Sequence, residues 1–406
     1  MKQGYIVLRG TPTDPVNRGE WRPTRSHGHG HGLDIQTAPA GAPVDFQADI
    51  EDLDETQLQE AYEDPRVLNV APIDGPLRLI EPLAIGALQP GLAADTDAPP
   101  WGLQAVGALS SMWTGRGIRV AVLDTGIDLT HEAFIPLLAK QRIVVRNFTE
   151  GAPGDVSDRH GHGTHCAGTI AGGAVGPLAR IGIAPGIERL IVGKVMGSGG
   201  NTNLMLVEAI NWAAAEGADV ISMSLGIDFP GMVQKLHLEQ QIPLPAATSQ
   251  ALKQYRETVG LFDNLARSML DRDVLLVAAT GNESQRPAFT IDVTPPAASN
   301  HIIKVGAVER GAGAPRVARF SNTGADLVAP GVDIVSAQRE GGLTTMTGTS
   351  MATPHVAGVA ALWAQRLRDE NGRLVLRDLM LKLLNSVLPL EDGRPHVGYG
   401  LVRAPQ

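Results

Sequence analysis

Gly348-Thr-Ser-Met-Ala-Thr-Pro354 is the stretch around which the rest of this 406-residue chain can be understood. Gly348 permits a sharp backbone turn, and the segment from Met351 to Ala364 is apolar on nearly every side, which is typical of a buried helix. Pro354 fits the first turn of such a helix, where the amides have no intrahelical partner. The sequence therefore predicts a helix that begins at Ser350, with free N–H groups and the positive end of the helix dipole beside its hydroxyl. An ordinary serine N-cap would give the same pattern.

Composition and charge narrow the class of protein. With 43% hydrophobic and 19% charged residues, the chain can bury a substantial core. Its length fits one large domain plus a smaller one, or two domains of ordinary size. The net charge of −9 and the lack of a basic stripe argue against nucleic acid as a partner. Cys166 is the only cysteine, which excludes an internal disulfide.

Hydrophobic runs in the sequence are short. A signal peptide needs about 7–15 consecutive apolar residues, and a membrane-spanning helix needs about 18. The run near the N-terminus, Tyr5-Ile-Val-Leu8, meets neither requirement. We therefore expect a cytoplasmic protein without a membrane anchor. Secretion by a non-classical route, or earlier removal of a signal, would leave the same sequence.

The first 80 residues have the pattern of a small α+β domain, and residues 81–100 that of a linker rich in Ala, Gly, Pro and Asp. Asp54 is placed to cap a helix over 55–63. The predicted strands cover residues 5–8, 44–50 and 67–70. The long loop before the second strand carries His27, His29 and His31 at alternate positions. This run fits either a flexible loop or a site for Zn²⁺ or Ni²⁺.

Residues 101–406 have the pattern of an α/β domain, in which apolar strands alternate with helices and form a mainly parallel sheet flanked on both faces. The predicted strands cover 118–123, 220–225, 274–279 and 302–308, and the predicted helices 203–216 and 249–269. The second of these helices belongs to a long insertion, 227–273. Ligands bind at the carboxyl ends of parallel strands, and Asp124, Ser224-Leu-Gly226 and Thr280-Gly-Asn-Glu283 fall at those ends.

A serine hydroxyl becomes an effective nucleophile when a base lies within hydrogen-bond reach and an acid orients that base. His160-Gly-His-Gly-Thr-His165 offers imidazoles, and Asp124-Thr-Gly126 offers a carboxylate. Together with Gly348-Thr-Ser-Met-Ala-Thr-Pro354, in the order Asp, His, Ser, these segments resemble the signatures of the subtilisin-like serine proteases. The resemblance extends over residues 101–404.

The resemblance implies a role for each matching residue. Ser350 would be the nucleophile, His162 the general base and then acid, and Asp124 the carboxylate that orients it. The side chain of Asn282 and the N–H of Ser350 would form the oxyanion hole. The substrate cleft would be lined by Gly199, Gly200, Leu206, Ser224, Leu225, Gly226 and Glu283. Cys166 would be a small buried residue beneath the histidine.

The chain also departs from the family pattern. No cofactor is expected for catalysis. The family's strong calcium site is expected to be absent or altered, because Ala133 and Gly176 stand where the family has an acid and an asparagine. The Pro-rich part of the insertion, 229–247, is expected to form an additional wall over the cleft.

The N-terminal domain resembles the family's propeptide, although the long loop before Val44 replaces the expected first helix. The resemblance implies a self-processing zymogen that acts on polypeptides, is inhibited by its own N-terminal domain and is cut within 81–100. We expect a monomer. The alternative is a catalytically silent, peptide-binding protein of the same fold. The acid-acting sedolisin group is a further alternative, but it lacks the His-Gly-Thr-His segment.

Overall fold

The structure is a computed structural model that describes residues 2–10, 46–73, 77–80, 98–197 and 202–406. Its centre is a ten-stranded sheet with the strand order β16-β17-β13-β11-β10-β8-β5-β7-β6, in which β12 pairs with β11. Every pairing is parallel except those of β12 and β16. The strands are β5 (Arg119–Asp124), β6 (Ile143–Asn147), β7 (Arg189–Lys194), β8 (Val220–Met223), β10 (Leu275–Ala279), β11 (Ile302–Glu309), β12 (Arg316–Val317), β13 (Leu327–Pro330), β16 (Val387–Leu388) and β17 (Leu401–Val402).

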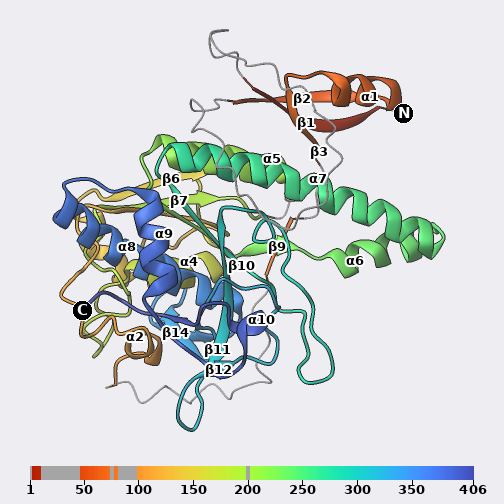
Figure 1. The fold of residues 1–406 in the computed structure, drawn as a ribbon. Helices are drawn as coiled ribbons and strands as arrows, with labels where there is room; N and C mark the ends of the chain where they lie inside the picture. Colours follow the sequence, from red (N-terminus) through yellow and green to blue (C-terminus); the bar gives the residue numbers. More distant parts are fainter. Residues whose placement is uncertain (1, 11–45, 74–76, 81–97, 198–201) are drawn as a thin grey trace, which may run out of the picture.

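Helices cover both faces of this sheet, as the sequence predicts (Figure 1). Side chains alternate along a strand, and in β5 Val120 and Val122 join one core cluster while Ala121 and Leu123 join another. The first cluster includes side chains of α4 (His162–Ala171), α8 (Thr349–Asn371) and α9 (Leu376–Asn385). The second includes side chains of α5 (Asn203–Ala215) and α7 (Leu244–Asp271).

Shorter elements connect these layers. They are α2 (Trp101–Ala105), η1 (Glu132–Phe134), α3 (Ile135–Leu138), β9 (Leu225–Ile227), α6 (Phe229–Gln234), the π-helix η2 (Lys235–Glu239), β14 (Ile334–Ala337), β15 (Leu343–Met346) and α10 (Arg394–Val397). The strand predicted over 220–225 is divided at Ser224 into β8 and β9. Helix α7 begins five residues before the predicted start, at Leu244.

The start of α8 differs from the sequence-based expectation. The helix begins at Thr349, and Gly348 occupies the N-cap position without a side-chain hydrogen bond, so the interpretation of Ser350 as an N-cap is wrong. Pro354 lies beyond the first turn, where its missing N–H would have bonded to the carbonyl of Ser350. The hydroxyl of Ser224 replaces that donor, with 2.9 Å between Ser224 Oγ and the carbonyl oxygen of Ser350.

The N-terminal strands form a separate antiparallel sheet with the order β2-β1-β3. Its elements are β1 (Gln3–Gly10), β2 (Phe46–Leu53), α1 (Glu55–Glu63) and β3 (Val67–Pro72). Asp54 caps α1 through a reciprocal capping box, as predicted.

Side chains on both faces of the central strand β1 are buried. Tyr5 and Val7 pack in the domain's own cluster with α1, while Ile6 and Leu8 join the cluster of α5 and α7. This explains why the run from Tyr5 to Leu8 is apolar at every position. The small domain therefore lies on α5 and α7 (Figure 1). The strand that follows, β4 (Leu77–Leu79), pairs with β9 of the large domain.

Candidate active site

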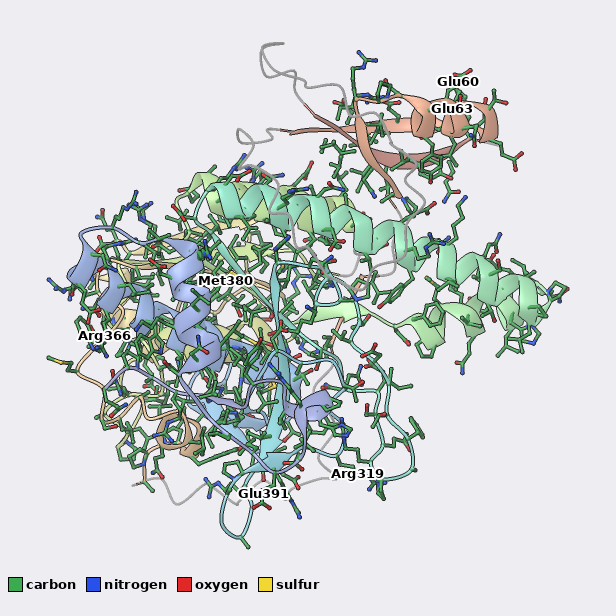
Figure 2. The ribbon with its side chains drawn as sticks, in the orientation of Figure 1. Glu60, Glu63, Arg319, Arg366, Met380 and Glu391 are labelled. Atoms are coloured by element: carbon green, nitrogen blue, oxygen red, sulfur yellow. The ribbon has the colours of Figure 1, made fainter. Side chains whose placement is uncertain are left out.

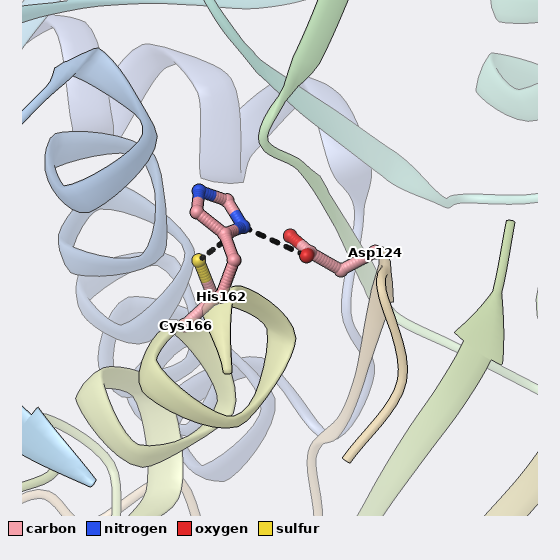
Figure 3. A group of neighbouring side chains, drawn as sticks. All are labelled: Asp124, His162 and Cys166. Carbon is pink, nitrogen blue, oxygen red and sulfur yellow. Dashed lines mark hydrogen bonds and ion pairs between the residues drawn. The ribbon is translucent and has the colours of Figure 1, made fainter. Parts of the chain in front are cut away.

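Asp124 and His162 form a buried hydrogen-bonded pair (Figure 3). Asp124 is the last residue of β5 and His162 the first residue of α4. His162 Nδ1 lies 2.7 Å from Asp124 Oδ1, an oxygen that also accepts the N–H of Thr125. Burial alone lowers the pKa of His162, but the neighbouring carboxylate outweighs burial, so the net pKa is raised well above its usual value. The pair thus has the geometry of a base oriented by an acid.

Asp158 fixes the position of this pair, and the sequence analysis missed it. Its carboxylate accepts five hydrogen bonds, from Thr125 Oγ1, from the amides of His160, Gly161 and Thr164, and from the hydroxyl of Thr164. Asp158 therefore ties the start of α4 to the end of β5. An acidic residue four positions before His162, at the start of a helix, was the available signal.

Ser350 lies in the first turn of α8 and is fully buried. Its Oγ donates to the carbonyl oxygen of Ile80 at 2.7 Å, and the carbonyl oxygen of Ser224 lies 3.5 Å away. His162 Nε2 has no hydrogen-bond partner within the described part of the chain. The serine hydroxyl is thus bonded to the N-terminal segment and not to the imidazole.

Asn282 is oriented toward the same helix start. Its Oδ1 accepts the N–H and the hydroxyl of Thr349, each at 2.9 Å. Because both groups of Thr349 donate, the atom that they contact must be the amide oxygen Oδ1. The NH₂ group of Asn282 is therefore directed away from Thr349. A Cβ atom added to Gly348 would lie 2.9 Å from Asn282 Nδ2, the nitrogen of this NH₂ group. The amide donor therefore lies beside the N-terminus of α8, near Ser350.

The N-terminal chain adds the strand β4 beside β9 of the large domain. In the antiparallel register of β4 and β9, Leu77 pairs with Ile227, Arg78 with Gly226 and Leu79 with Leu225. Gly226 has no side chain, and a Cβ atom added there would lie 3.2 Å from Ile80 Cδ1. The edge that was predicted to bind an extended peptide, Ser224 to Gly226, is therefore paired with a segment of this same chain.

The remaining predicted binding residues divide into three groups. Leu206 and Leu225 are almost completely buried and belong to the core cluster of α5 and α7. Glu283 is partly buried, and its Oε2 accepts Asn322 Nδ2 at 2.6 Å. Outside the described residues lie Gly199 and Gly200, together with His27, His29, His31 and most of the predicted linker.

Comparison with known proteins matches residues 115–400 to the model of the Subtilase family. The chain is a subtilase. It is 35% identical to an intracellular serine protease of Paenibacillus polymyxa over 310 residues, which are 75% of this chain and 84% of that protein. It is also 35% identical to the major intracellular serine protease of Bacillus subtilis (strain 168) over 321 residues, which are 76% of this chain and 88% of that protein. The protein named Subtilisin Savinase, of Lederbergia lenta, is 35% identical over 277 residues, covering 66% and 84%.

Membership of this family confirms three sequence-based expectations: the resemblance, the α/β fold, and the assignment of the protein as a hydrolase of the serine protease type.

No helix in the described ranges is long and apolar enough to cross a bilayer.

Metal-binding groups are sparse in the described part of this subtilase. Ala133 offers no carboxylate, its carbonyl accepts the N–H of Gly173, and Gly176 has a positive φ of 54°. In the ranges that the structure covers, the group of side chains within metal-ligand reach is Asp124, His162 and Cys166. Cys166 Sγ lies 3.8 Å from His162 Nδ1 and is buried, as expected of a small residue beneath the histidine (Figure 3).

Proposed function

We propose that this subtilase is a serine endopeptidase in which Asp124, His162 and Ser350 act as the catalytic triad. The family template supplies the steps. His162 Nε2 takes the proton of Ser350 Oγ as that oxygen attacks a peptide carbonyl carbon. The negative charge that develops on the carbonyl oxygen is stabilised by the Asn282 amide and the Ser350 N–H. The imidazolium then gives its proton to the departing amine, and water releases the acyl group from Ser350.

We propose further that the chain is a zymogen whose N-terminal domain, residues 1–80, inhibits the catalytic domain. The observation that carries this proposal is the hydrogen bond from Ser350 Oγ to the carbonyl oxygen of Ile80. The hydroxyl proton points to this oxygen while His162 Nε2 is without a partner among the described residues. The segment that ends at Ile80 lies against Ser350 and along β9, where a substrate would have to bind, and this supports a latent state.

The register of the N-terminal strand suggests which bond is cut first. An extended substrate pairs with the cleft edge through main-chain hydrogen bonds, and β4 pairs with β9 up to Leu79. The next carbonyl belongs to Ile80 and contacts Ser350. The bond between Ile80 and Glu81, at the start of the proposed processing region 81–100, is therefore the first candidate.

Specific contacts support docking of the N-terminal domain. Tyr62 donates its hydroxyl to Glu257 of α7 at 2.8 Å. Asn203 Nδ2, at the start of α5, donates to the carbonyl oxygen of Pro72 at 3.3 Å. These bonds lie next to the apolar contacts of Ile6 and Leu8 with the same helices. The domain thus holds the start of β4 at the cleft as an intramolecular inhibitor would.

The substrates of the mature enzyme would be polypeptides. Two relatives are named intracellular serine proteases, and on this basis we propose a cytoplasmic location for this protein. A monomer without a catalytic cofactor remains our expectation.

Ser350→Ala tests both proposals, with Ser110→Ala, an exposed serine outside the cleft, as the matched control. The wild-type chain and the control should be cut after Ile80, which mass spectrometry of the new N-terminus would identify as Glu81. The Ser350→Ala chain should remain full length. Processing of this variant at the normal rate would exclude self-cleavage.

The observed Ser350 geometry also suits the silent, peptide-binding alternative. A serine-directed fluorophosphonate probe distinguishes the two. Covalent labelling of the processed wild-type protein, and none of Ser350→Ala, supports an enzyme. Equal absence of labelling in both chains supports the silent alternative.

A further inference from the structure

Asn322 is a polar residue to which the proposed mechanism gives no role. It lies in the segment between β12 and β13 and is fully buried. A buried amide group carries an acceptor and two donors, and buried polar groups of this kind are normally satisfied by the protein itself. The partners of this amide therefore show which part of the fold depends on it.

The oxygen of the amide holds the two residues that follow Asn282. Asn322 Oδ1 accepts the N–H groups of Glu283 and Ser284 and the hydroxyl of Ser284, each at 3.1 Å. The N–H of Ser284 also donates to the carbonyl oxygen of Phe320 at 3.2 Å. The N–H of Glu283 therefore depends more on Asn322 than that of Ser284 does.

The donors of Asn322 hold the two residues that precede Asn282. Asn322 Nδ2 donates to the carbonyl oxygen of Thr280 at 3.1 Å and to Glu283 Oε2 at 2.6 Å. The backbone N–H of Asn322 donates to the carbonyl oxygen of Gly281 at 3.1 Å. Bonds from this one residue thus reach the chain before Asn282 as well as after it.

Gly281 permits this close contact between the two segments. Its φ of 111° lies in the left-handed region that favours glycine. A Cβ atom added to Gly281 would overlap Asn322 Nδ2. The backbone beside Asn282 therefore fits against Asn322 only because the residue there has no side chain.

The position of Asn282 matters because its amide is the proposed side-chain donor of the oxyanion hole. Thr349 orients the amide from the side of α8, through the two bonds to Asn282 Oδ1. These bonds act on the end of the side chain, whereas Asn322 acts on the backbone that carries it. A displacement of about 1 Å in a catalytic group can lower a rate by about 10²-fold.

We propose that Asn322 is a positioning residue for the oxyanion hole: it holds the segment 280–284 so that the Asn282 amide reaches the developing negative charge. The proposal rests on the proposed protease activity. The effect of Asn322 on the reaction passes through Asn282.

A double-mutant cycle tests this route. With a peptide p-nitroanilide as substrate, processed Asn322→Ala should have a kcat about 10- to 100-fold below that of wild type, with KM changed by less than about threefold. In an Asn282→Ala background the same replacement should lower kcat by less than about threefold, because the donor that Asn322 positions is then absent. An equal loss of kcat in both backgrounds, or a raised KM at unchanged kcat, would overturn the proposal.

Gln365→Ala is the matched control, because Gln365 is another buried amide that holds backbone. Its Oε1 accepts the N–H groups of residues 114–116 at 3.0, 2.8 and 3.0 Å. In Figure 2, Arg366, which follows Gln365, and Arg319, which precedes Asn322 by three positions, are labelled on opposite sides of the large domain. The control should be less stable than wild type but keep kcat within about twofold. A loss of kcat equal to that of Asn322→Ala would attribute the effect to general destabilisation and overturn the proposal.

Hydrogen exchange measures the hold on the segment without catalysis. In the full-length Ser350→Ala chain, the amide of Glu283 should exchange about tenfold faster once Asn322 is replaced by alanine, while the amides of β6 should be unaffected. If wild type cuts no peptide but exchange changes in this way, the protease proposal fails and the structural hold of Asn322 stands. If wild type cuts peptides but Asn322→Ala changes neither exchange nor kcat, the positioning role alone fails.

Discussion

Replacement of Asp158 by asparagine probes the network that holds Asp124 and His162 together. The change preserves the shape of the side chain and removes its negative charge. The wild-type Oδ1 accepts Thr125 Oγ1 at 2.9 Å and the amides of His160 and Gly161 at 3.0 and 2.7 Å. An asparagine oxygen in that position would keep these three bonds.

The second oxygen determines the size of the loss. Asp158 Oδ2 accepts the amide and the hydroxyl of Thr164 at 2.8 and 2.7 Å. The NH₂ group of the asparagine and the N–H of Thr164 would both be donors, so they could not form a hydrogen bond. The Thr164 hydroxyl could rotate and accept a hydrogen bond from the NH₂ group. An unsatisfied buried donor costs about 1–3 kcal/mol, and the remaining bonds lose their charge assistance. We therefore expect the free energy of unfolding to fall by about 2–4 kcal/mol.

The effect should depend on pH. Burial raises the pKa of Asp158, but the hydrogen bonds from Thr164 and Gly161 outweigh burial and lower the net pKa below the usual value. A lowered folded-state pKa means that the stabilisation is present above the unfolded value of about 3.9 and is lost as pH falls through the folded value. The difference between wild type and Asp158→Asn should be constant near neutral pH and shrink below about pH 4.

Urea unfolding of the full-length chain, in a Ser350→Ala background that prevents self-digestion, measures this difference. Asp155→Asn is the matched control, because Asp155 lies on the same loop but is exposed and accepts the amide of Ser157 at 3.1 Å. The control should change stability by about 0.5 kcal/mol or less. Equal stabilities of the two variants, or a difference from wild type that does not shrink as pH falls below about 4, would refute the assigned role of Asp158.

Three further predictions concern the proposed mechanism. Asn282→Ala should lower kcat by about 10²–10³-fold with little change in KM, the loss known for the corresponding donor in subtilisin; an unchanged kcat would remove Asn282 from the oxyanion hole. Burial of Glu257 outweighs the hydrogen bond that its carboxylate accepts from Tyr62 and raises its pKa, so Glu257 should stabilise the folded chain most below about pH 4.5, and this contribution should be lost as pH rises through the raised pKa. Hydrogen exchange over 46–73 should show this trend in wild type and lose it in Glu257→Gln. Mercuric ion should inhibit wild type by binding Cys166 beside His162, and Cys166→Ala should retain activity in its presence.

Short-range patterns in the sequence were sufficient for several of the helices and strands. The apolar run before Asp124 predicted β5, and Asp54 followed by Gln57 predicted the capped helix α1. The strand ends predicted where Asp124 and Asn282 would lie, because ligands bind at the carboxyl edge of a parallel sheet. Each of these signals depends on neighbours within a few positions of the chain.

Contacts between distant segments could be found only in the tertiary structure. The bond from Ser350 to Ile80 joins residues 270 positions apart and depends on how the N-terminal domain lies on α5 and α7. The Ser224 hydroxyl replaces the donor that Pro354 lacks only because β8 ends beside α8. Local propensity does not encode such contacts, since they arise from the packing of surfaces that form only when the whole chain has folded.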